Sequence, residues 1–267
     1  MLPGDKRFYG RESAMDLGLK GRKAILIGAN ASVGRHAAEV LAQEGCHVAL
    51  CGRTQEKVDR VIETVRRFDV QAFGKAVDAS DAVALPTFIE EAADALGGCD
   101  IFISFVSTNL GVDSDEGWQA VMNADILPLS RGIRAALPFL QQSDAGSIVT
   151  LSSTGAVEDF MGPQPYNALK AAVINYSNAL AQKHAAEGIR VNCLIPGPIY
   201  TDDGPWAAIK ANMTEFYDSI LSQIPMGRMC TGEEIGRAIA FVASPACRFM
   251  TGASLVVDGG LTKRVQF

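Results

Sequence analysis

Short β-forming runs alternate with longer helical patterns along most of this 267-residue chain, and this alternation limits the fold more than any other feature. The expected strands are residues 24–27, 47–50, 72–77, 101–104, 147–151, 190–194 and 254–257. Apolar residues at helical spacing fill residues 34–44, 55–68, 82–96, 118–140, 166–187 and 233–243. Strands that alternate with helices require right-handed crossovers and a parallel sheet covered on both faces. The sequence therefore predicts an α/β fold: a single doubly wound parallel sheet of seven strands.

The same alternation predicts how the chain is divided. Residues 1–20 are polar without a clear period, so we expect an N-terminal extension followed by a single domain over residues 21–267. Residues 196–232 depart from the alternation and follow the sixth expected strand. A long insertion beyond the carboxyl end of such a strand is usually functional, and we interpret residues 200–228 as a substrate lid. Its apolar stripe is Trp206, Ile209, Met213, Phe216 and Ile220.

Charge and cysteine content exclude several partners. The net charge is −6, from 24 basic and 30 acidic residues, so neither nucleic acid nor an anionic membrane is an expected partner. The six cysteines form no C-x-x-C pair, which favours a reducing, cytoplasmic location. His36, His47 and His184 have no metal-ligand spacing, and no metal site is expected.

The first expected strand runs into a helix through a turn of small residues. Such a turn presents helix N-terminal amides to the pyrophosphate of a dinucleotide. The alternative is a tight loop whose glycines serve packing alone. Its position after the first strand favours dinucleotide binding. The candidate cofactor contacts here are Gly28, Asn30, Ser32, Val33 and Gly34.

The second expected strand is followed by Gly52-Arg53. An acidic residue here would bind the ribose 2′-hydroxyl and repel a 2′-phosphate, whereas an arginine attracts that phosphate. The sequence thus favours NADP over NAD, and the alternative is a merely exposed Arg53.

Tyr166 and Lys170 stand four residues apart at the start of an expected helix. This spacing places them on one face with Cβ atoms about 5–6 Å apart. The pKa of a free tyrosine is about 10, so a phenolate that works near neutral pH needs about 4 kcal/mol of stabilisation, which a nearby cation supplies. The alternative is an interfacial tyrosine beside a solvated lysine. Ser153 argues for catalysis, because it ends a strand at the carboxyl edge of the sheet, where such folds bind ligands.

With these motifs the chain resembles the short-chain dehydrogenase/reductase family, in its 3-oxoacyl-ACP reductase-like branch, from about Leu17 to Thr262. The matching motifs are Ser153 with Tyr166-x-x-x-Lys170, Arg190-Val191-Asn192, Pro196-Gly197-Pro198-Ile199, Thr251-Gly252-Ala253 and Val257-Asp258-Gly259-Gly260. The resemblance implies a Rossmann sheet of order 3-2-1-4-5-6-7 and hydride transfer between NAD(P) and a small-molecule ketone or alcohol. The resemblance also implies a homotetramer, which is a frequent assembly in this family.

The resemblance also implies residue roles. Tyr166 would exchange a proton with the substrate oxygen, Lys170 would depress the tyrosine pKa and hold the nicotinamide ribose, and Ser153 would hydrogen-bond the carbonyl. Asp78 would contact adenine, and Ile199 and Thr201 the carboxamide. The further expected cofactor contacts are Ala79, Ser104, Pro196 and Gly197.

Three positions depart from the family pattern. Ser32 replaces a glycine of the turn, which a close cofactor would tolerate if the φ of Ser32 is negative. The segment 104–107, Ser-Phe-Val-Ser, replaces Asn-Asn-Ala-Gly and leaves Ser104 only a hydroxyl. Asp125 stands where the family has a catalytic asparagine; a carbonyl-held water would survive this change, whereas a buried carboxylate near Lys170 would alter the local charge.

The expected function is that of an NADP(H)-preferring oxidoreductase that interconverts a ketone and a secondary alcohol, with Ser153, Tyr166, Lys170 and Asp125 as catalytic candidates. An NAD-dependent alcohol dehydrogenase of the same fold is one alternative. A cofactor-sensing protein without catalysis is another. The pair Asp202-Asp203 is expected to be a solvated edge of the lid.

Overall fold

The computed structural model describes residues 15–108 and 111–265. Most of the expected N-terminal extension, residues 1–14, lies outside the described residues. Leu19, at the end of that extension, is buried in the same apolar core as Ala24 and Leu26. Within the described ranges no helix is long and apolar enough to cross a membrane.

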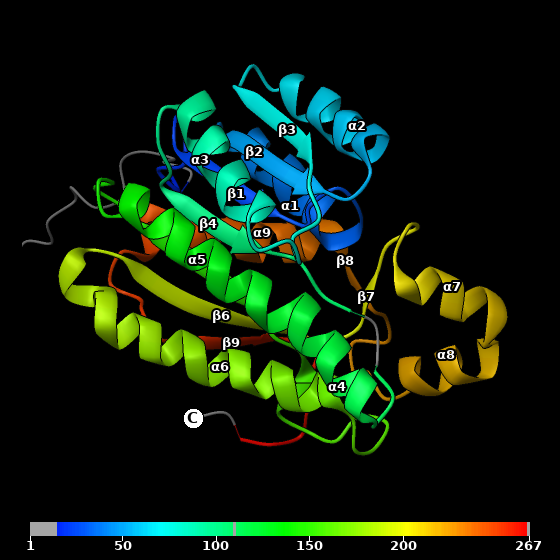
Figure 1. Ribbon diagram of the computed structural model, residues 1–267. Helices are drawn as coiled ribbons and strands as arrows, with labels where there is room; N and C mark the ends of the chain where they lie inside the picture. Colours follow the sequence, from blue (N-terminus) through cyan, green and yellow to red (C-terminus); the bar gives the residue numbers. More distant parts are fainter. Residues whose placement is uncertain (1–14, 109–110, 266–267) are drawn as a thin grey trace, which may run out of the picture.

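A single parallel sheet of seven strands forms the centre of the molecule (Figure 1). Its order is β3-β2-β1-β4-β5-β6-β9, which confirms the predicted topology. The strands are β1 (Lys23–Ile27), β2 (His47–Gly52), β3 (Ala72–Ala76), β4 (Ile101–Ser104), β5 (Ser147–Leu151), β6 (Arg190–Pro196) and β9 (Ser254–Val257). A second pair, β7 (Ile199–Tyr200) with β8 (Cys230–Thr231), was not expected from the sequence; it ties the start of the insertion to its end.

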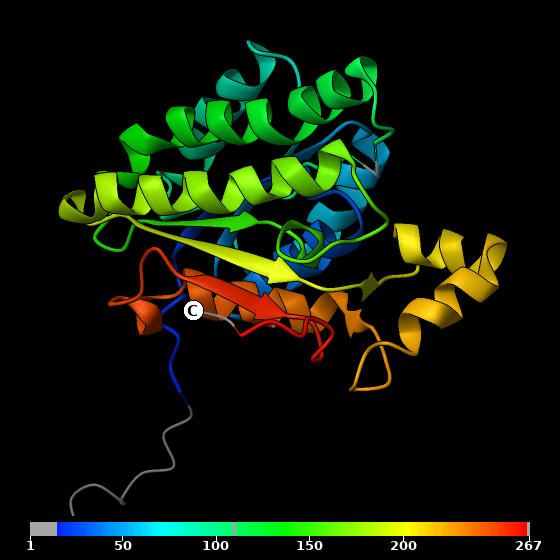
Figure 2. The same cartoon turned by 90° about the horizontal axis from the view of Figure 1, so that it is seen from below.

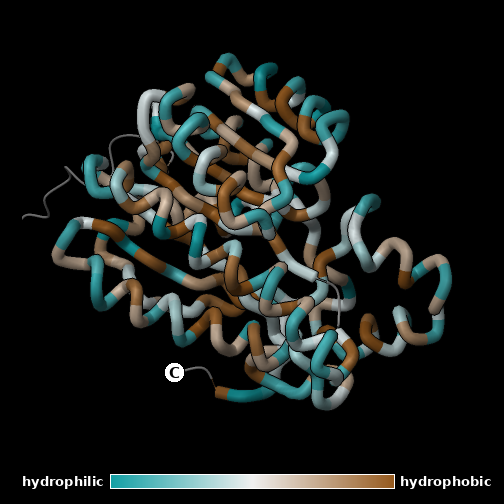
Figure 3. The backbone as a smooth tube through the Cα atoms, in the orientation of Figure 1, coloured by the Kyte–Doolittle hydropathy of each residue, from teal (hydrophilic) through white to brown (hydrophobic). Residues whose placement is uncertain are grey.

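Helices cover both faces of the sheet, as Figures 1 and 2 show from two directions. Side chains alternate along β1, so Ile25 and Ile27 join one core and Ala24 and Leu26 the other. The first core is closed by α3 (Ala84–Leu96), α5 (Leu127–Leu140) and α6 (Pro165–His184); the second by α1 (Ser32–Gln43), α2 (Gln55–Arg66) and α9 (Gly232–Ala243). Figure 3 shows apolar positions along the inner strands and hydrophilic ones recurring on the outer helix turns.

The helix expected over residues 118–140 is interrupted. It consists of α4 (Asp115–Val121), a π-helical turn (Met122–Ile126) and α5. Pro128 at the start of α5 has no N–H and cannot supply the α-helical hydrogen bond to residue 124. The wide turn carries Asp125, which the structure buries.

The insertion that carries the expected apolar stripe is divided into two helices. It forms α7 (Pro205–Asn212) and α8 (Thr214–Leu221), which lie to one side of the sheet (Figures 1 and 2). Tyr217 and Ile220 are buried in a small core of their own, against which Trp206, Ile209 and Phe216 pack. Met213, at the break between the helices, is exposed instead of joining this stripe.

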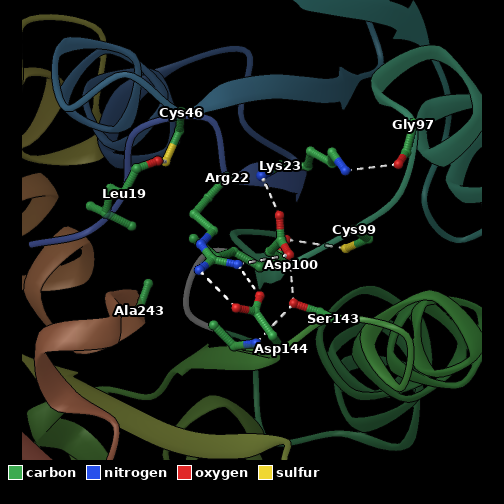
Figure 4. Close-up of polar contacts among 12 residues, drawn as sticks. Leu19, Arg22, Lys23, Cys46, Gly97, Cys99, Asp100, Ser143, Asp144 and Ala243 are labelled. Carbon is green, nitrogen blue, oxygen red and sulfur yellow. Dashed lines mark hydrogen bonds and ion pairs between the residues drawn. The ribbon is translucent and has the colours of Figure 1, made fainter.

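A polar cluster fastens the amino ends of the strands (Figure 4). The buried Asp100 accepts hydrogen bonds from the Lys23 amide, at 2.8 Å, and from the Ser143 hydroxyl. The Arg22 guanidinium lies 3.6 Å from Asp100 and also pairs with Asp144. These contacts join the starts of β1 and β4 to the turn before β5, at the opposite edge from the candidate site.

Arg190 and Asn192, which belong to one of the family motifs, stabilise the fold through hydrogen bonds to backbone groups. The Arg190 guanidinium donates to the carbonyls of Val242 (2.9 Å) and Ala243 (2.8 Å), so it satisfies the carboxyl end of α9. The Asn192 amide donates to Met250 O (2.9 Å) and its oxygen accepts from Ala253 N (3.0 Å), which positions the edge strand β9.

Candidate active site

The turn between β1 and α1 is closely packed around its glycines. Gly28 has φ +71°, and a Cβ there would lie 2.9 Å from the Val106 backbone nitrogen. At Gly34 a Cβ would lie 2.6 Å from the Ala29 Cα. Neither position can carry a side chain without displacing backbone, so packing by itself already requires glycine at both positions.

Ser32 does not meet the expected condition of a negative φ. Its φ is +47°, a left-handed conformation that costs a non-glycine residue about 1 kcal/mol. Two contacts offset this cost: the Ser32 hydroxyl lies 2.9 Å from the Thr201 hydroxyl, and the Ser32 amide donates to Asp203 Oδ2 at 3.0 Å. The side chain that replaces the family's glycine thus links the turn to the first residues of the insertion.

Asp203 is exposed, as expected for a solvated edge, but its side chain also makes contacts that the sequence did not predict. Its carboxylate lies at the amino end of α1, with Arg35 Nε at 3.7 Å. Although partial burial raises the pKa of Asp203, the Ser32 amide and the Arg35 cation hold it below its ordinary value. The amino end of α1 therefore already binds an anionic oxygen atom.

The second strand ends beside the same turn. A Cβ on Gly52 would lie 2.1 Å from the Asn30 side chain, so these residues pack directly together. Arg53 follows with an exposed side chain. Hydrogen bonds from Ser80, helped by the positive charge of Arg53, lower the pKa of the exposed Asp78. Asn30, Arg53 and Asp78 are thus neighbours at the carboxyl edge of β1, β2 and β3.

Three hydrogen bonds fasten α6 to β5 and thereby place Tyr166 and Lys170. The Ser152 hydroxyl donates to Lys170 O at 2.8 Å, and Lys170 Nζ lies 3.4 Å from Leu151 O. Farther along the helix, the Thr150 and Ser177 hydroxyls are 2.7 Å apart. All three contacts are made by the end of the strand that leads to Ser153.

The three main candidates have distinct surroundings. The Ser153 oxygen accepts the Gly155 amide at 3.2 Å, which leaves its O–H to donate to another oxygen. Tyr166 is half-buried in the first turn of α6, and Lys170 Nζ lies 5.6 Å from the centroid of its ring. Lys170 itself is buried. Tyr166 and Lys170 thus share one face of the helix, as their spacing predicts. The alternative of a solvated lysine is wrong, because Lys170 is buried.

Asp125 pairs directly with Lys170. Asp125 Oδ2 lies 3.0 Å from Lys170 Nζ, and the two side chains are only 1% and 6% exposed. The Ser107 hydroxyl donates to the same oxygen at 2.7 Å, and the Thr108 amide donates to Oδ1 at 2.7 Å. The sequence left open whether position 125 would alter the charge near Lys170. The structure shows that it does, because a buried carboxylate pairs with the ammonium.

The remaining predicted residues gather along the same edge of the sheet. Ser104 ends β4 opposite Ile27, and Pro196 ends β6 opposite Val257. A Cβ on Gly197 would lie 2.8 Å from Asp258 Cβ. Thr201 is buried against Ser32. The other predicted positions are Val33 in the first turn of α1, Ile199 in β7 and the buried Ala79 after β3.

Sequence reasoning missed Ser107 and Asp203. Ser107 was noted only as part of an atypical segment, and its contact with Asp125 spans eighteen residues of chain. Asp203 contacts a residue 171 positions earlier, and no spacing signal predicts such a pair. Over the described ranges, no group of three or more His, Cys, Asp or Glu side chains is arranged to hold a metal ion.

Comparison with known proteins agrees with this geometry. Residues 28–262 match the family model described as enoyl-(acyl carrier protein) reductase. Isoepoxydon dehydrogenase patN of Aspergillus clavatus is 30% identical over 93% of this chain and 98% of its own length. The 3-oxoacyl-[acyl-carrier-protein] reductase FabG of Chlamydia pneumoniae is also 30% identical, over 93% of this chain and its full length.

Solved structures extend the similarity to a ligand complex. L-sorbose reductase from Gluconobacter frateurii, complexed with NADPH and L-sorbose, has a TM-score of 0.86 and 27% identity over 94% of this chain and all of its own. The matched family model spans the β1 turn, Ser153, Tyr166 and Lys170. The chain is therefore a member of the short-chain dehydrogenase/reductase family, in its 3-oxoacyl-ACP reductase-like branch, and an oxidoreductase.

Proposed function

We propose that this protein is an NADP(H)-preferring carbonyl reductase that interconverts a small-molecule ketone and a secondary alcohol. The observation that carries the proposal is the placement of Tyr166 in the first turn of α6, with the buried Lys170 ammonium 5.6 Å from its ring and Ser153 at the end of the adjoining strand. A phenol, a fixed cation and a second hydroxyl are the groups needed to bind a carbonyl oxygen and exchange a proton with it.

The chemistry of the β1 turn supports dinucleotide binding, although the Asp203 carboxylate occupies the amino end of α1 in this structure. Its amide at Ser32 already binds a carboxylate oxygen, and helix N-termini bind pyrophosphate by the same chemistry. The exposed Arg53 supports a 2′-phosphate, and the neighbouring Asp78 and Ala79 are suited to the adenine side. Residues 196–201 would line the nicotinamide side.

When bound, NADPH supplies the hydride that the carbonyl carbon receives. The chain's own residues handle the oxygen. The Ser153 O–H hydrogen-bonds the carbonyl oxygen, and the Tyr166 phenol donates the proton that converts this oxygen to a hydroxyl. The Lys170 charge stabilises the phenolate that remains, until a proton from solvent restores the phenol. In the oxidative direction Tyr166 removes that proton instead.

The aromatic side chains of the lid favour a partly hydrophobic substrate. Trp206 and Phe216 stack with ring centroids 6.2 Å apart, and Tyr217 meets Trp206 edge-on at 6.3 Å. Such an aromatic lid favours ligands with apolar surface. The relatives named above act on different substrates, so their names do not select a particular ketone for this chain.

Two measurements test this function. NADPH fluorescence titration of the purified protein is expected to show saturable binding, and a panel of ketones is expected to contain one that oxidises NADPH. Tyr166→Phe should abolish turnover while NADPH affinity stays within a few-fold, since the aromatic ring remains and only the hydroxyl is lost. Failure to bind either dinucleotide, or full activity in Tyr166→Phe, would contradict the proposal.

The proposal includes two expectations that come with the family resemblance, a homotetramer and a cytoplasmic location. None of the six cysteines is in a disulfide, which agrees with a reducing compartment. Light scattering after size-exclusion chromatography will test the tetramer, for which a mass near four times 28.3 kDa is expected.

A further inference from the structure

The contact between Asp125 and Lys170 brings a full negative charge beside the cation of the candidate site. The Asp125 carboxylate is held on both oxygens, by the Ser107 hydroxyl and the Thr108 amide, each at 2.7 Å. It therefore cannot turn away from Lys170 without losing hydrogen bonds inside a buried region, where each lost bond is costly. The 3.0 Å pair is a fixed part of the site.

This pair keeps Lys170 charged and at the same time screens its charge. Burial alone would favour a neutral amine, but the Asp125 carboxylate raises the pKa of Lys170. An ammonium in direct contact with a carboxylate has a much weaker field at a distance than an isolated one. Tyr166 thus lies beside an ammonium whose charge is partly screened by a carboxylate, and not beside an isolated positive charge.

We propose that Asp125 is a positioning residue that holds Lys170 in place and weakens its effect on Tyr166, so that the phenol stays protonated, and ketone reduction persists, to higher pH. This inference rests on the proposed function, because it assumes that Tyr166 is the proton donor. A carbonyl reductase needs the protonated phenol, whereas alcohol oxidation needs the phenolate.

The other groups that face Lys170 do not supply the same charge. The Leu151 carbonyl, from β5, is neutral and lies 3.4 Å from Nζ. Cys193, from β6, is a buried thiol whose pKa burial raises, so it stays uncharged near neutral pH. Ser107, which follows β4, is a neutral donor to the carboxylate. Asp125 is thus the only anionic group among these neighbours.

Two departures from the family pattern, Ser107 and Asp125, contact each other directly. The segment 104–107 ends in Ser107, whose hydroxyl donates to Asp125 Oδ2. A glycine at position 107 could not donate this bond, and an asparagine at 125 would not pair as an anion with Lys170. The serine and the aspartate therefore act together as one charged, hydrogen-bonded unit.

Asp125→Asn is the test, with two readouts. The first is a tyrosinate absorbance titration without cofactor, taken as the difference from the same protein carrying Tyr166→Phe. We expect the ionisation midpoint of Tyr166 to move down by about one pH unit in Asp125→Asn. The second is the pH profile of kcat/KM for ketone reduction, whose basic limb should move down by the same amount.

Asp115→Asn is the matched control, because it removes an exposed carboxylate from α4 and should leave both midpoints unchanged. Asp125→Ser repeats the test with a smaller neutral residue if Asp125→Asn does not fold, as judged by circular dichroism. An unchanged or higher midpoint in the folded variant overturns the inference. The absorbance titration needs no turnover, so its outcome stands apart from that of the proposed function.

Discussion

The Ser32 amide donates a hydrogen bond to Asp203 Oδ2 at 3.0 Å, so a side chain from the insertion lies at the amino end of α1. A dinucleotide pyrophosphate that binds there as proposed must displace this carboxylate. We expect Asp203→Asn to bind NADPH several-fold more tightly, because a neutral amide competes less well for the Ser32 amide.

Fluorescence titration of Asp203→Asn and Asp202→Asn side by side will check this prediction. Asp202 is exposed and serves as the control, with affinity expected to stay unchanged. Weaker NADPH binding by Asp203→Asn would contradict it, and would mean that the carboxylate stays bound to the Ser32 amide when the cofactor binds.

Arg53→Asp tests the cofactor preference. The exposed guanidinium after β2 should attract the 2′-phosphate, whereas an aspartate should repel it and accept the ribose 2′-hydroxyl. The ratio of NADPH to NADH kcat/KM is expected to fall at least about tenfold, or about 1.4 kcal/mol. Arg67→Asp, at the far end of α2, should leave the ratio unchanged. A ratio that stays constant in both variants would favour the NAD-dependent alternative.

Asp100→Ala tests the polar cluster at the amino edge of the sheet. The substitution leaves the Lys23 amide and the Ser143 hydroxyl without their acceptor and removes a negative charge beside Arg22. We expect the free energy of unfolding, measured in urea, to fall by about 3 kcal/mol. Asp144→Ala, whose side chain is 80% exposed, should change stability little. Equal effects of the two substitutions would contradict this ranking.

Glu234 gives a prediction about acid stability. Hydrogen bonds from Arg228 and from Thr231 lower the pKa of Glu234 to about 2. Because the folded state lowers this pKa, the group stabilises the fold above the ordinary carboxyl value of about 4.3, and its contribution is lost as pH falls toward 2. Glu234→Gln should therefore be less stable than the unmodified protein at pH 7, with the difference shrinking as the pH is lowered. Urea unfolding at several pH values will measure it. Salt should weaken the effect, because the pair with Arg228 is solvent-exposed.

The topology and the main site residues could be predicted because they depend on local signals. The parallel seven-stranded sheet follows from the alternation, and its strand order follows from the family resemblance. The placement of Tyr166 and Lys170 follows from one turn of helix and the preceding strand. The positive φ of Ser32 could not be predicted, because Thr201 and Asp203 stabilise it from the far end of the chain. Likewise, the fate of the Asp125 carboxylate depended on tertiary partners that no local pattern reveals.

The π-helical turn at Met122–Ile126 makes chain length itself a requirement of the site. Each residue of a helix turns it by about 100°, so the loss of one residue from this turn would rotate α4 by about that angle relative to α5. Val121, the buried residue of α4, and Asp125, which pairs with Lys170, could not then both keep their contacts. A one-residue deletion here would disrupt the site, although every side chain named in the mechanism would still be present.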